Sequence, residues 1–459
     1  MLPSFLLGII VSLLEKEIPL MHMNSAAEAL YKEKLMTPEM AAGMVKSGDR
    51  VYAGTASSFA YALLDALWER RHELENVVIM GSMGYQKCPI YDETVDNPFL
   101  FNTFFMGVNE RKQQKAGKHV TYNSVHLSMV DDWAYDIAKP DVCFFEVSKP
   151  DENGYMSFGP SGTATQGALA QVGKKIIVQV NSHTPYVLGE GNLIHVSHID
   201  AIVEADRPYD DFVTMVPDDT SETIAKYILE EIPDGATFQL GLGNISTAIG
   251  YGLRHKNDLG IHTELLNDPM LALMESGNVT NKNKGYMDGK TVFSFTLGGR
   301  HLYDTLERNE KFYVMPFRVA NDARLIAKNR NMISINATMS VNLFGEAASD
   351  CVGWRQQSAT GGQLDFVRGA QWSEGGKSFI ATASCFEKNG KLVSKIVPYF
   401  APGTAVTTPR SDIQYVATEY GCVNLKKLTA EDRAKALISI AHPAFREELT
   451  AQAKEFGLI

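Results

Sequence analysis

The sequence predicts an α/β protein made of two related α/β domains with mostly parallel sheets, and three observations support this fold class. Helix-like and strand-like segments alternate from Met36 onward and are separated by glycines, as in parallel sheets connected by helices. This order of segments occurs twice along the chain. The two copies also share one spacing, because aligning Gly48 with Gly235 aligns Gly54 with Gly241. A chance similarity of generic α/β units is the alternative.

The first copy begins with a helix signal. Thr37 is a favourable N-cap and Pro38 fits the first helical turn, so we expect a helix that ends near Gly48. The next segments predict a strand with a small-residue turn, an amphipathic helix and a buried strand: 50–58, 59–75 and 76–83.

The second copy repeats this order. Its segments predict a helix, a strand with a glycine turn, a second helix and a second strand: 220–235, 236–244, 245–256 and 259–265. A later pair, 144–159 and 334–349, agrees with the repeat, because each segment reads as a strand, a polar stretch and a return through glycine.

The repeat and a polar, proline-containing stretch define the expected domain limits. We expect an N-terminal extension, a first domain, a linker and a second domain at residues 1–23, 24–205, 206–219 and 220–459. The apolar run from Leu2 to Leu14 is shorter than the roughly 20 residues that cross a bilayer, and it lacks the features of a secretory signal. A short docking segment is the alternative interpretation of the extension.

Composition excludes several classes of function. The chain has 459 residues, of which 45% are hydrophobic and 21% charged, and its formal net charge is −11. An overall negative field argues against a general binder of nucleic acid or anionic membranes. The five cysteines have no spacing typical of zinc or iron–sulfur sites, so we expect free thiols in a reducing cytoplasm and no bound metal.

A single carboxylate distinguishes the second copy from the first. The second strand of the first copy ends in "IMGSM", whereas its counterpart ends in "IHTEL" with Glu264. Open α/β sheets place their chemistry at the carboxyl ends of strands, which makes Glu264 a candidate reactive residue. A carboxylate paired with a neighbouring cation is the alternative.

Two glycine loops are candidate ligand sites. "GLGNIS", residues 241–246, resembles half of a dinucleotide-binding fingerprint, but Ser246 replaces the third glycine, so dinucleotide binding is a weak alternative. "TGGQ", residues 360–363, would expose consecutive backbone N–H groups to an oxyanion or to a thin extended ligand. An ordinary turn is the alternative for this loop.

Several motifs together carry a resemblance to one family. In chain order they include "GLGNISTAIG", "GIHTEL", "SGNVTNKNK", "MISINATMSVNLFGEAASD", "TGGQLDFVRGA", "KIVPYFAPGTAVTT" and "RAKALISIAHPAFREEL". With them the chain resembles the acetyl-CoA hydrolase/transferase family from about Lys34 to its C-terminus. Within that family it is most similar to the butyryl-CoA:acetate and 4-hydroxybutyrate CoA-transferases.

This resemblance implies roles for particular residues in CoA-transferase-like tandem domains. It implies that Glu264 is the nucleophile, and that the amides of Leu242 and of Gly361, or else Gly362, stabilise an oxyanion. It implies further contacts with the CoA substrate by Gly241, Gly243, Asn244, Ile245, Asn321, Gly362, Gln363 and Phe366.

The resemblance also implies the reaction. The expected enzyme transfers CoA between a short-chain acyl-CoA and a free carboxylate, such as acetate with butyrate or 4-hydroxybutyrate, through a glutamyl-CoA thioester with ping-pong kinetics. Its partners would be acyl-CoA and a small carboxylic acid, without a cofactor, nucleic acid or membrane, in a cytoplasmic homo-oligomer. The alternatives are an acyl-CoA hydrolase on the same fold, an NAD-dependent dehydrogenase and a non-catalytic acyl-CoA binder.

Overall fold

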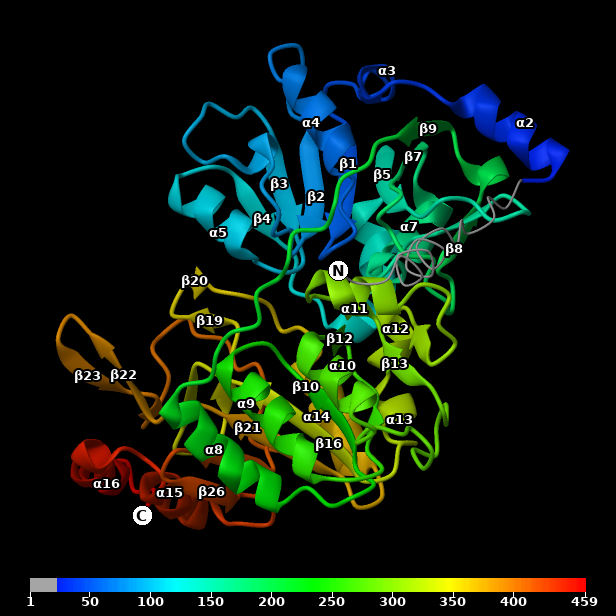
Figure 1. Cartoon of the computed structure of the whole chain (residues 1–459). Coiled ribbons are helices and arrows are strands. Elements are labelled where there is room, and N and C mark those ends of the chain that lie inside the picture. Colours follow the sequence, from blue (N-terminus) through cyan, green and yellow to red (C-terminus); the bar gives the residue numbers. More distant parts are fainter. Residues whose placement is uncertain (1–22) are drawn as a thin grey trace, which may run out of the picture.

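The computed structural model describes residues 23–459, so nearly all of the predicted N-terminal extension lies outside the described residues. Figure 1 shows two sheet-containing units, with the first half of the chain above the second. Within residues 23–459, no helix is both long and apolar enough to cross a membrane.

The first unit is built on a seven-stranded sheet with the order β4-β3-β2-β1-β5-β7-β9, in which every neighbouring pair is parallel. Most of its strand residues are buried, because helices and loops cover both faces. The strands are β1 (Arg50–Thr55), β2 (Val78–Ser82), β3 (Leu100–Thr103), β4 (Val120–Tyr122), β5 (Val142–Val147), β7 (Ile176–Val180) and β9 (Ala201–Glu204).

The second unit is built on a six-stranded sheet with the order β11-β10-β16-β21-β25-β26. Its pairs are parallel except for the terminal hairpin of β25 and β26. The strands are β10 (Thr237–Leu240), β11 (Gly260–Ile261), β16 (Met332–Ala337), β21 (Lys377–Ala381), β25 (Tyr415–Thr418) and β26 (Gly421–Asn424).

The two sheets share one topology. The order β2-β1-β5-β7-β9 in the first sheet corresponds to β11-β10-β16-β21-β25 in the second, strand for strand in chain order. The aligned glycines agree locally, since Gly48 and Gly235 both precede the first strand and both have positive φ, +83° and +72°. The prediction of two related α/β domains with mostly parallel sheets is confirmed.

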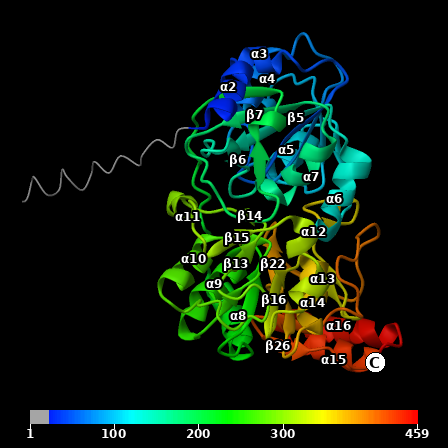
Figure 2. The ribbon, with the colours of Figure 1, turned by 90° about the vertical axis from the view of Figure 1, so that its right-hand side faces the viewer.

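Helices flank the sheets in both units, as the two views show (Figures 1 and 2). In the first unit they are α2 (Ser25–Lys34), α3 (Pro38–Ala42), α4 (Tyr61–Glu69), α5 (Val108–Lys115), α6 (Val130–Asp132) and α7 (Gln166–Val172). In the second they are α8 (Asp219–Glu230), α9 (Asn244–Gly252), α10 (Asp268–Glu275), α11 (Arg300–Thr305), α12 (Phe317–Ala320), α13 (Ala323–Ile326), α14 (Gln363–Trp372), α15 (Ala430–Ser439) and α16 (Pro443–Glu455).

Short strands outside the large sheets shape the region between the units. Those that matter for the site are β12 (Leu265–Leu266), which pairs with β14 (Phe295–Thr296), and β13 (Thr291–Phe293), which pairs with β15 (Phe312–Val314). The others are β6 (Tyr155–Ser157), β8 (Leu193–His195), β17 (Ser340–Asn342), β18 (Ala347–Ala348), β19 (Cys351–Val352), β20 (Arg355–Gln356), β22 (Cys385–Lys388), β23 (Lys391–Ser394) and β24 (Ile396–Val397).

Two predicted elements differ from the structure. The helix that Thr37 caps ends at Ala42 rather than near Gly48, because the chain leaves it through tight turns in which Met44 N donates to Ala41 O at 3.1 Å. The predicted strand 259–265 is interrupted. Its backbone leaves β10 after residue 262, and Thr263 N donates to Val292 O at 3.0 Å instead.

The predicted linker, residues 206–219, has no helix or strand before α8 begins at its last residue. It is held at several points nonetheless. Phe212 N donates to Gly298 O at 3.1 Å, and the Tyr209 hydroxyl donates to Glu146 Oε1 at 2.7 Å. The segment is therefore anchored to both units at these points.

Backbone contacts fasten the two units to each other. Gly189 approaches Val314 so closely that a Cβ would overlap the Val314 carbonyl oxygen. Glu190 N donates to that oxygen at 2.9 Å, and the Ser161 hydroxyl accepts from Thr296 N at 3.0 Å. These contacts join loops of the first unit to the short strands β14 and β15 of the second.

Candidate active site

Glu264 lies in the gap between β11 and β12, where the chain passes from the large sheet to the small strands. Its backbone is fixed, because the Glu264 carbonyl accepts from the amides of Ser294 and Phe295, each at 2.9 Å. The residue as a whole is partly exposed. Its side chain is therefore presented from a rigid break between two strands.

Asn321 is the polar side chain that binds this carboxylate. Its Nδ2 donates to Glu264 Oε2 at 2.9 Å, although the two residues are far apart in sequence. Asn321 is fully buried at the C-terminal end of α12, and its Oδ1 has no hydrogen-bond partner. The Nδ2 group of Asn321 thus binds Glu264, whereas its Oδ1 can accept a hydrogen bond from a further donor.

The second glycine loop approaches the same carboxylate. A Cβ at Gly362 would overlap both Glu264 Oε2 and Asn321 Nδ2, so only glycine fits at this position. The Gly362 amide also stabilises the charged form of Glu264. Gly361, in contrast, has φ of +61° and accepts from Leu127 N at 3.2 Å through its carbonyl.

The two glycines differ in their relation to Glu264. The sequence predicts the oxyanion amide at Gly361 first, with Gly362 as the alternative, and this role stays a prediction. Of the two glycines, Gly362 is the one whose amide acts on Glu264. The reason is geometric, because the positive φ of Gly361 turns its neighbour toward the carboxylate and its own carbonyl toward the first unit.

The surroundings raise the pKa of Glu264 to about 7. Desolvation is the largest cause, and the charge of Asp365 raises the pKa further. The Asn321 amide and the Gly362 N–H oppose this shift by binding the charged form. Glu264 is therefore more basic than an exposed glutamate, which suits a nucleophile.

Asp365 is a second carboxylate at the site, and the sequence analysis missed it. It accepts from Ser128 Oγ at 2.8 Å and from Ser128 N at 3.2 Å, and burial raises its pKa to about 6. Ser128 belongs to the first unit, whereas Asp365 lies in the first turn of α14. The only signal in the sequence was an acidic residue just after "GGQ", and nothing local connects it with Ser128.

Two domain models of one family match this chain. Residues 20–217 match the model of the acetyl-CoA hydrolase/transferase N-terminal domain, and residues 298–453 match that of the C-terminal domain. The chain belongs to the acetyl-CoA hydrolase/transferase family. The family resemblance drawn from the motifs is confirmed.

Three relatives within the family illustrate the likeness. The chain is 41% identical to succinyl-CoA:cyclohexane-1-carboxylate CoA transferase of Geobacter metallireducens over 94% of this chain and 98% of the relative. It is 38% identical to 4-hydroxybutyrate coenzyme A transferase of Clostridium kluyveri over 93% and 99% of the two chains. The crystal structure of RipA from Yersinia pestis superposes with a TM-score of 0.87 at 36% identity, covering 94% of this chain and all of RipA.

The first glycine loop of this family member connects β10 with α9. The sequence analysis named Gly241, Leu242, Gly243, Asn244 and Ile245 here. Leu242 is 43% exposed, and Asn244 Oδ1 is buried without a partner. Because β10 and β11 are adjacent and parallel, the loop lies at the same sheet edge as the strand that leads to Glu264. The oxyanion role of Leu242 stays a prediction, since no contact joins its amide to Glu264.

The loop borders a small hollow of about 80 Å³. Its wall includes Leu242 and Leu297 from the second unit, and Phe212, Val213 and Met215 from the predicted linker. Val213 is 80% exposed, so the linker presents an apolar edge beside the glycine loop. The sequence analysis treated this segment only as a connection between domains.

Two residues that the sequence predicts to contact CoA have buried side chains. Phe366 is fully buried, and its ring packs edge-on against His262 with the ring centres 6.1 Å apart. Gln363 is also buried, and its Nε2 donates to Thr408 Oγ1 at 2.8 Å. Both belong to the first turns of α14, whose inward face supports the loop, and their predicted contacts with CoA stay a prediction.

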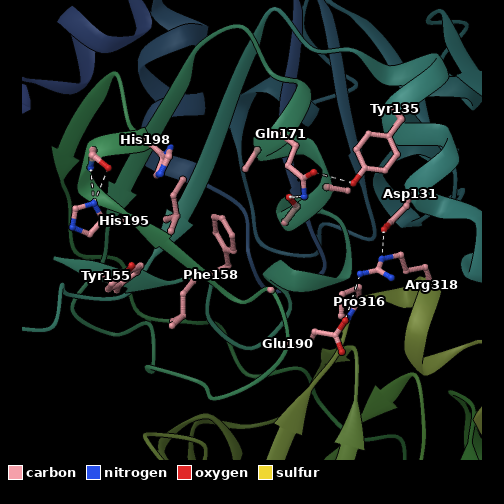
Figure 3. A pocket seen from close by; sticks show the side chains of 17 residues that line it. Asp131, Tyr135, Tyr155, Phe158, Gln171, Glu190, His195, His198, Pro316 and Arg318 are labelled. Carbon is pink, nitrogen blue, oxygen red and sulfur yellow. Dashed lines mark hydrogen bonds and ion pairs between the residues drawn. The ribbon is translucent and has the colours of Figure 1, made fainter. Parts of the chain in front are cut away.

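A separate hollow of about 560 Å³ is lined by residues of both units (Figure 3). There Arg318 of α12 forms ion pairs with Asp131 at 2.8 Å and with Glu190 at 3.4 Å, both in the first unit. Glu264 does not line this hollow. Arg318 affects the site indirectly, because its ion pairs hold α12, the helix that directly precedes Asn321.

The chemistry available at the site follows from these groups. One basic carboxylate, an amide donor on its Oε2, a glycine N–H that stabilises its charged form and a second buried carboxyl group lie where the two units meet. Among residues 23–459, no three His, Cys, Asp or Glu side chains are grouped in a way that could hold a metal ion. The arrangement suits nucleophilic attack by Glu264 with charge stabilisation on its own carboxyl oxygen.

Proposed function

We propose that this family member is a CoA-transferase that moves CoA from an acyl-CoA to a free carboxylate, with Glu264 as the covalent nucleophile. The observation that carries the proposal is the Asn321 amide, which donates to Glu264 Oε2 at 2.9 Å, together with the Gly362 N–H, which also stabilises the charged carboxylate. These donors stabilise negative charge on the glutamyl oxygen itself, which is where charge develops when a thiolate attacks a glutamyl carbonyl.

The first half-reaction has two steps. Glu264 Oε1 attacks the thioester carbonyl, the carbon–sulfur bond breaks, and CoA leaves as a thiolate with an acyl-glutamyl anhydride left behind. The thiolate then attacks the glutamyl carbonyl carbon, the bond to the acyl group breaks, and the first acid leaves as a carboxylate. In the second step the oxyanion forms on Oε2, opposite the Asn321 amide that already lies 2.9 Å away.

The second half-reaction reverses these steps with a different acid. An incoming carboxylate attacks the glutamyl-CoA thioester, which releases the thiolate and forms a new anhydride. The thiolate attacks the acyl carbonyl of that anhydride and regenerates the Glu264 carboxylate. One thioester replaces another of similar energy, so we propose that no cofactor and no metal take part. The order of release predicts ping-pong kinetics.

Positioning and water exclusion would supply most of the rate. A carboxylate is a poor nucleophile, but effective molarity in a bound complex lowers the barrier by roughly 7 kcal/mol or more. The site lies between the two units and raises the pKa of Glu264, which indicates desolvation. A dry site protects both intermediates from hydrolysis, and this favours transfer over plain acyl-CoA hydrolysis.

The substrate class follows from the family and from named relatives. We propose a short-chain acyl-CoA as donor and a small carboxylate as acceptor, with acetate, butyrate and 4-hydroxybutyrate as the first candidates. The relative from Geobacter metallireducens carries succinyl-CoA and cyclohexane-1-carboxylate in its name, so these two belong in the same test.

An acceptor screen tests this function. The full chain is given acetyl-CoA and, separately, propionate, butyrate, 4-hydroxybutyrate, succinate and cyclohexane-1-carboxylate, and the products are separated by chromatography. We expect a new acyl-CoA with at least one acid and little free CoA without an acceptor. Steady release of free CoA at a rate independent of the acceptor identifies a hydrolase. If the wild-type chain catalyses no reaction, and Glu264→Gln binds CoA as tightly as the wild type does, the protein is a CoA-binding protein.

We also propose a cytoplasmic, homo-oligomeric enzyme. The support for the location is the free state of all five cysteines, which is usual in a reducing compartment. The support for self-association is exposed apolar surface, including Trp354, which is 90% exposed, and Val216, which is 86% exposed. Light scattering on the purified chain measures the oligomeric state directly.

A further inference from the structure

His262 lies two residues before Glu264, and its ring connects two segments around the site. It is fully buried, and both of its ring nitrogens have a partner. Asn329 Nδ2 lies 3.0 Å from His262 Nδ1, and His262 Nε2 lies 2.8 Å from the carbonyl oxygen of Ala320. A buried histidine with two specific partners is held in one orientation.

The neighbours determine which nitrogen carries the proton. Asn329 Nδ2 also lies 3.0 Å from the Ile326 carbonyl, so it is a donor and His262 Nδ1 accepts. The Ala320 carbonyl can only accept, so His262 Nε2 donates to it. Burial, aided by the charge of Lys284, lowers the pKa of His262 to about 3, so the ring stays neutral at assay pH.

The acceptor of this hydrogen bond is the peptide unit that carries Asn321. Ala320 is the last residue of the four-residue helix α12, and so short a helix leaves its terminal carbonyls without intrahelical partners. Asn321 N donates to Phe317 O at 2.9 Å, while the Ala320 oxygen of the same peptide unit accepts from His262. The peptide is therefore fixed at both its nitrogen and its oxygen.

Resting on the proposed function, we propose that His262 is a positioning residue whose Nε2–H fixes the Ala320–Asn321 peptide and thereby aims the Asn321 amide at Glu264. The arrangement is economical in sequence. The segment between β11 and β12 carries both the nucleophile and, two residues earlier, the group that positions the donor for that nucleophile. Any small shift of β11 would therefore move the nucleophile and its donor together.

A direct proton-transfer role for His262 does not fit this geometry. Both ring nitrogens are engaged, the side chain has no exposed surface, and the ring is enclosed by Phe366, Tyr286 and the buried Lys284. Its effect on the reaction must pass through Ala320 and Asn321. The remaining alternative is a purely structural histidine whose loss lowers stability and nothing else.

Two substitutions separate these roles. In His262→Gln the side-chain amide can reach the position of Nε2 and donate to the Ala320 carbonyl. In His262→Asn the shorter amide replaces only the Nδ1 side and cannot reach Ala320. Leu259→Ala, a buried apolar truncation just before β11, serves as the matched control for lost stability alone.

We expect His262→Asn to lower kcat on the order of 10²-fold with a small change in the KM for acyl-CoA, because the donor is misplaced. The acidic limb of its pH–rate profile should shift to higher pH, toward the position of the limb in Asn321→Ala, since the Asn321 hydrogen bond lowers the pKa of Glu264. His262→Gln should keep the limb near the wild-type position. Leu259→Ala should lower Tm and leave the limb unmoved.

The double variant His262→Asn/Asn321→Ala completes the cycle. If His262 acts through Asn321, the double variant loses no more activity than Asn321→Ala alone. Additive losses, or a His262→Asn profile whose acidic limb stays at the wild-type pH, overturn the proposal. If His262→Asn does not fold, His262→Gln gives the test. The proposal is overturned if the acidic limb of the His262→Gln pH profile lies at the same pH as that of Asn321→Ala.

These outcomes are distinct from failure of the proposed function. Formation of a CoA adduct on Glu264 in the wild-type chain reports on the function itself. A wild-type chain that forms the adduct, with His262 variants that behave as Leu259→Ala does, rejects the positioning role and leaves the transferase mechanism intact. A wild-type chain without adduct rejects the mechanism on which the positioning role rests.

Discussion

The Asn321 side-chain amide lies 2.9 Å from Glu264 Oε2 and joins the end of α12 to the break between β11 and β12. This contact sets a local balance. Desolvation raises the pKa of the Glu264 carboxyl group, while the hydrogen bond from Asn321 lowers it by stabilising the charged form. The same amide is therefore placed to donate a hydrogen bond to that oxygen as negative charge develops on it during the reaction.

Asn321→Ala should lower kcat roughly 10²-fold, because it removes a preplaced donor from the developing oxyanion. The KM for acyl-CoA should change little, since the amide acts on the nucleophile rather than on the CoA body. Initial rates over a range of acyl-CoA concentrations separate the two parameters. A variant with raised KM and normal kcat would place Asn321 in substrate binding instead.

The pH dependence should report the ionisation of Glu264. Only the carboxylate attacks, so kcat/KM should rise with pH and level off above an apparent pKa near 7. Asp365→Asn should shift this limb to lower pH, because the Asp365 charge raises the pKa of Glu264. A limb that stays near the ordinary glutamate value of 4.5 in the wild type would contradict the desolvated site.

The two loop glycines should respond differently to alanine. A Cβ at Gly362 overlaps the Glu264 carboxylate and the Asn321 amide, so Gly362→Ala should cost at least roughly 10²-fold in kcat. A Cβ at Gly361 meets only Phe105, at 3.9 Å, but its φ of +61° strains alanine by about 1 kcal/mol.

Gly361→Ala should accordingly lower Tm more clearly than it lowers the rate of the reaction. Thermal unfolding and initial rates on the two variants make the comparison. Equal activity losses in both would mean that the loop as a whole, rather than the contact of Gly362 with Glu264, governs the site.

Glu146 should make stability depend on pH. It is buried beneath the Tyr209 hydroxyl, and burial raises its folded-state pKa from 4.5 to about 7. The folded state therefore holds a proton that the unfolded state releases. The stability this contributes is fully present below pH 4.5 and is lost as pH rises through about 7.

Glu146→Gln removes that dependence. The unfolding free energy of the wild type relative to this variant should fall by on the order of 3 kcal/mol between pH 4.5 and pH 8. Urea denaturation at both pH values measures the difference. A difference that is independent of pH would mean that Glu146 has the same pKa in the folded and unfolded chain.

Local signals in the sequence predicted the architecture well. The Gly48 and Gly235 turns and the strands after them follow from residue pattern alone, and the shared sheet order confirms the repeat that they indicated. Thr37 caps its helix as expected, with its hydroxyl accepting from Met40 N. The boundaries were less predictable, because tight turns after Ala42 and the departure of Thr263 from the sheet depend on neighbouring segments.

The site was predictable only in part for a related reason. Glu264 and the "GGQ" loop are visible as motifs, and the structure brings them together with Asn321. Two hydrogen bonds join segments that no spacing rule connects. One runs from Ser128 to Asp365, and the other from His262 to Ala320. The burial of Phe366 and Gln363 could not be predicted either, because the sequence of a glycine-rich loop at a helix start does not show which side chains face inward.

Mass spectrometry of the Glu264 peptide tests the central claim most directly. The wild-type chain is incubated with acyl-CoA without an acceptor, quenched, digested and compared with Glu264→Gln treated in parallel. The account predicts a CoA-sized mass on the wild-type peptide that carries Glu264, its loss when an acceptor carboxylate is added, and no adduct in Glu264→Gln. An unmodified Glu264 peptide in a chain that transfers CoA at full rate, or full activity of Glu264→Gln, would contradict it.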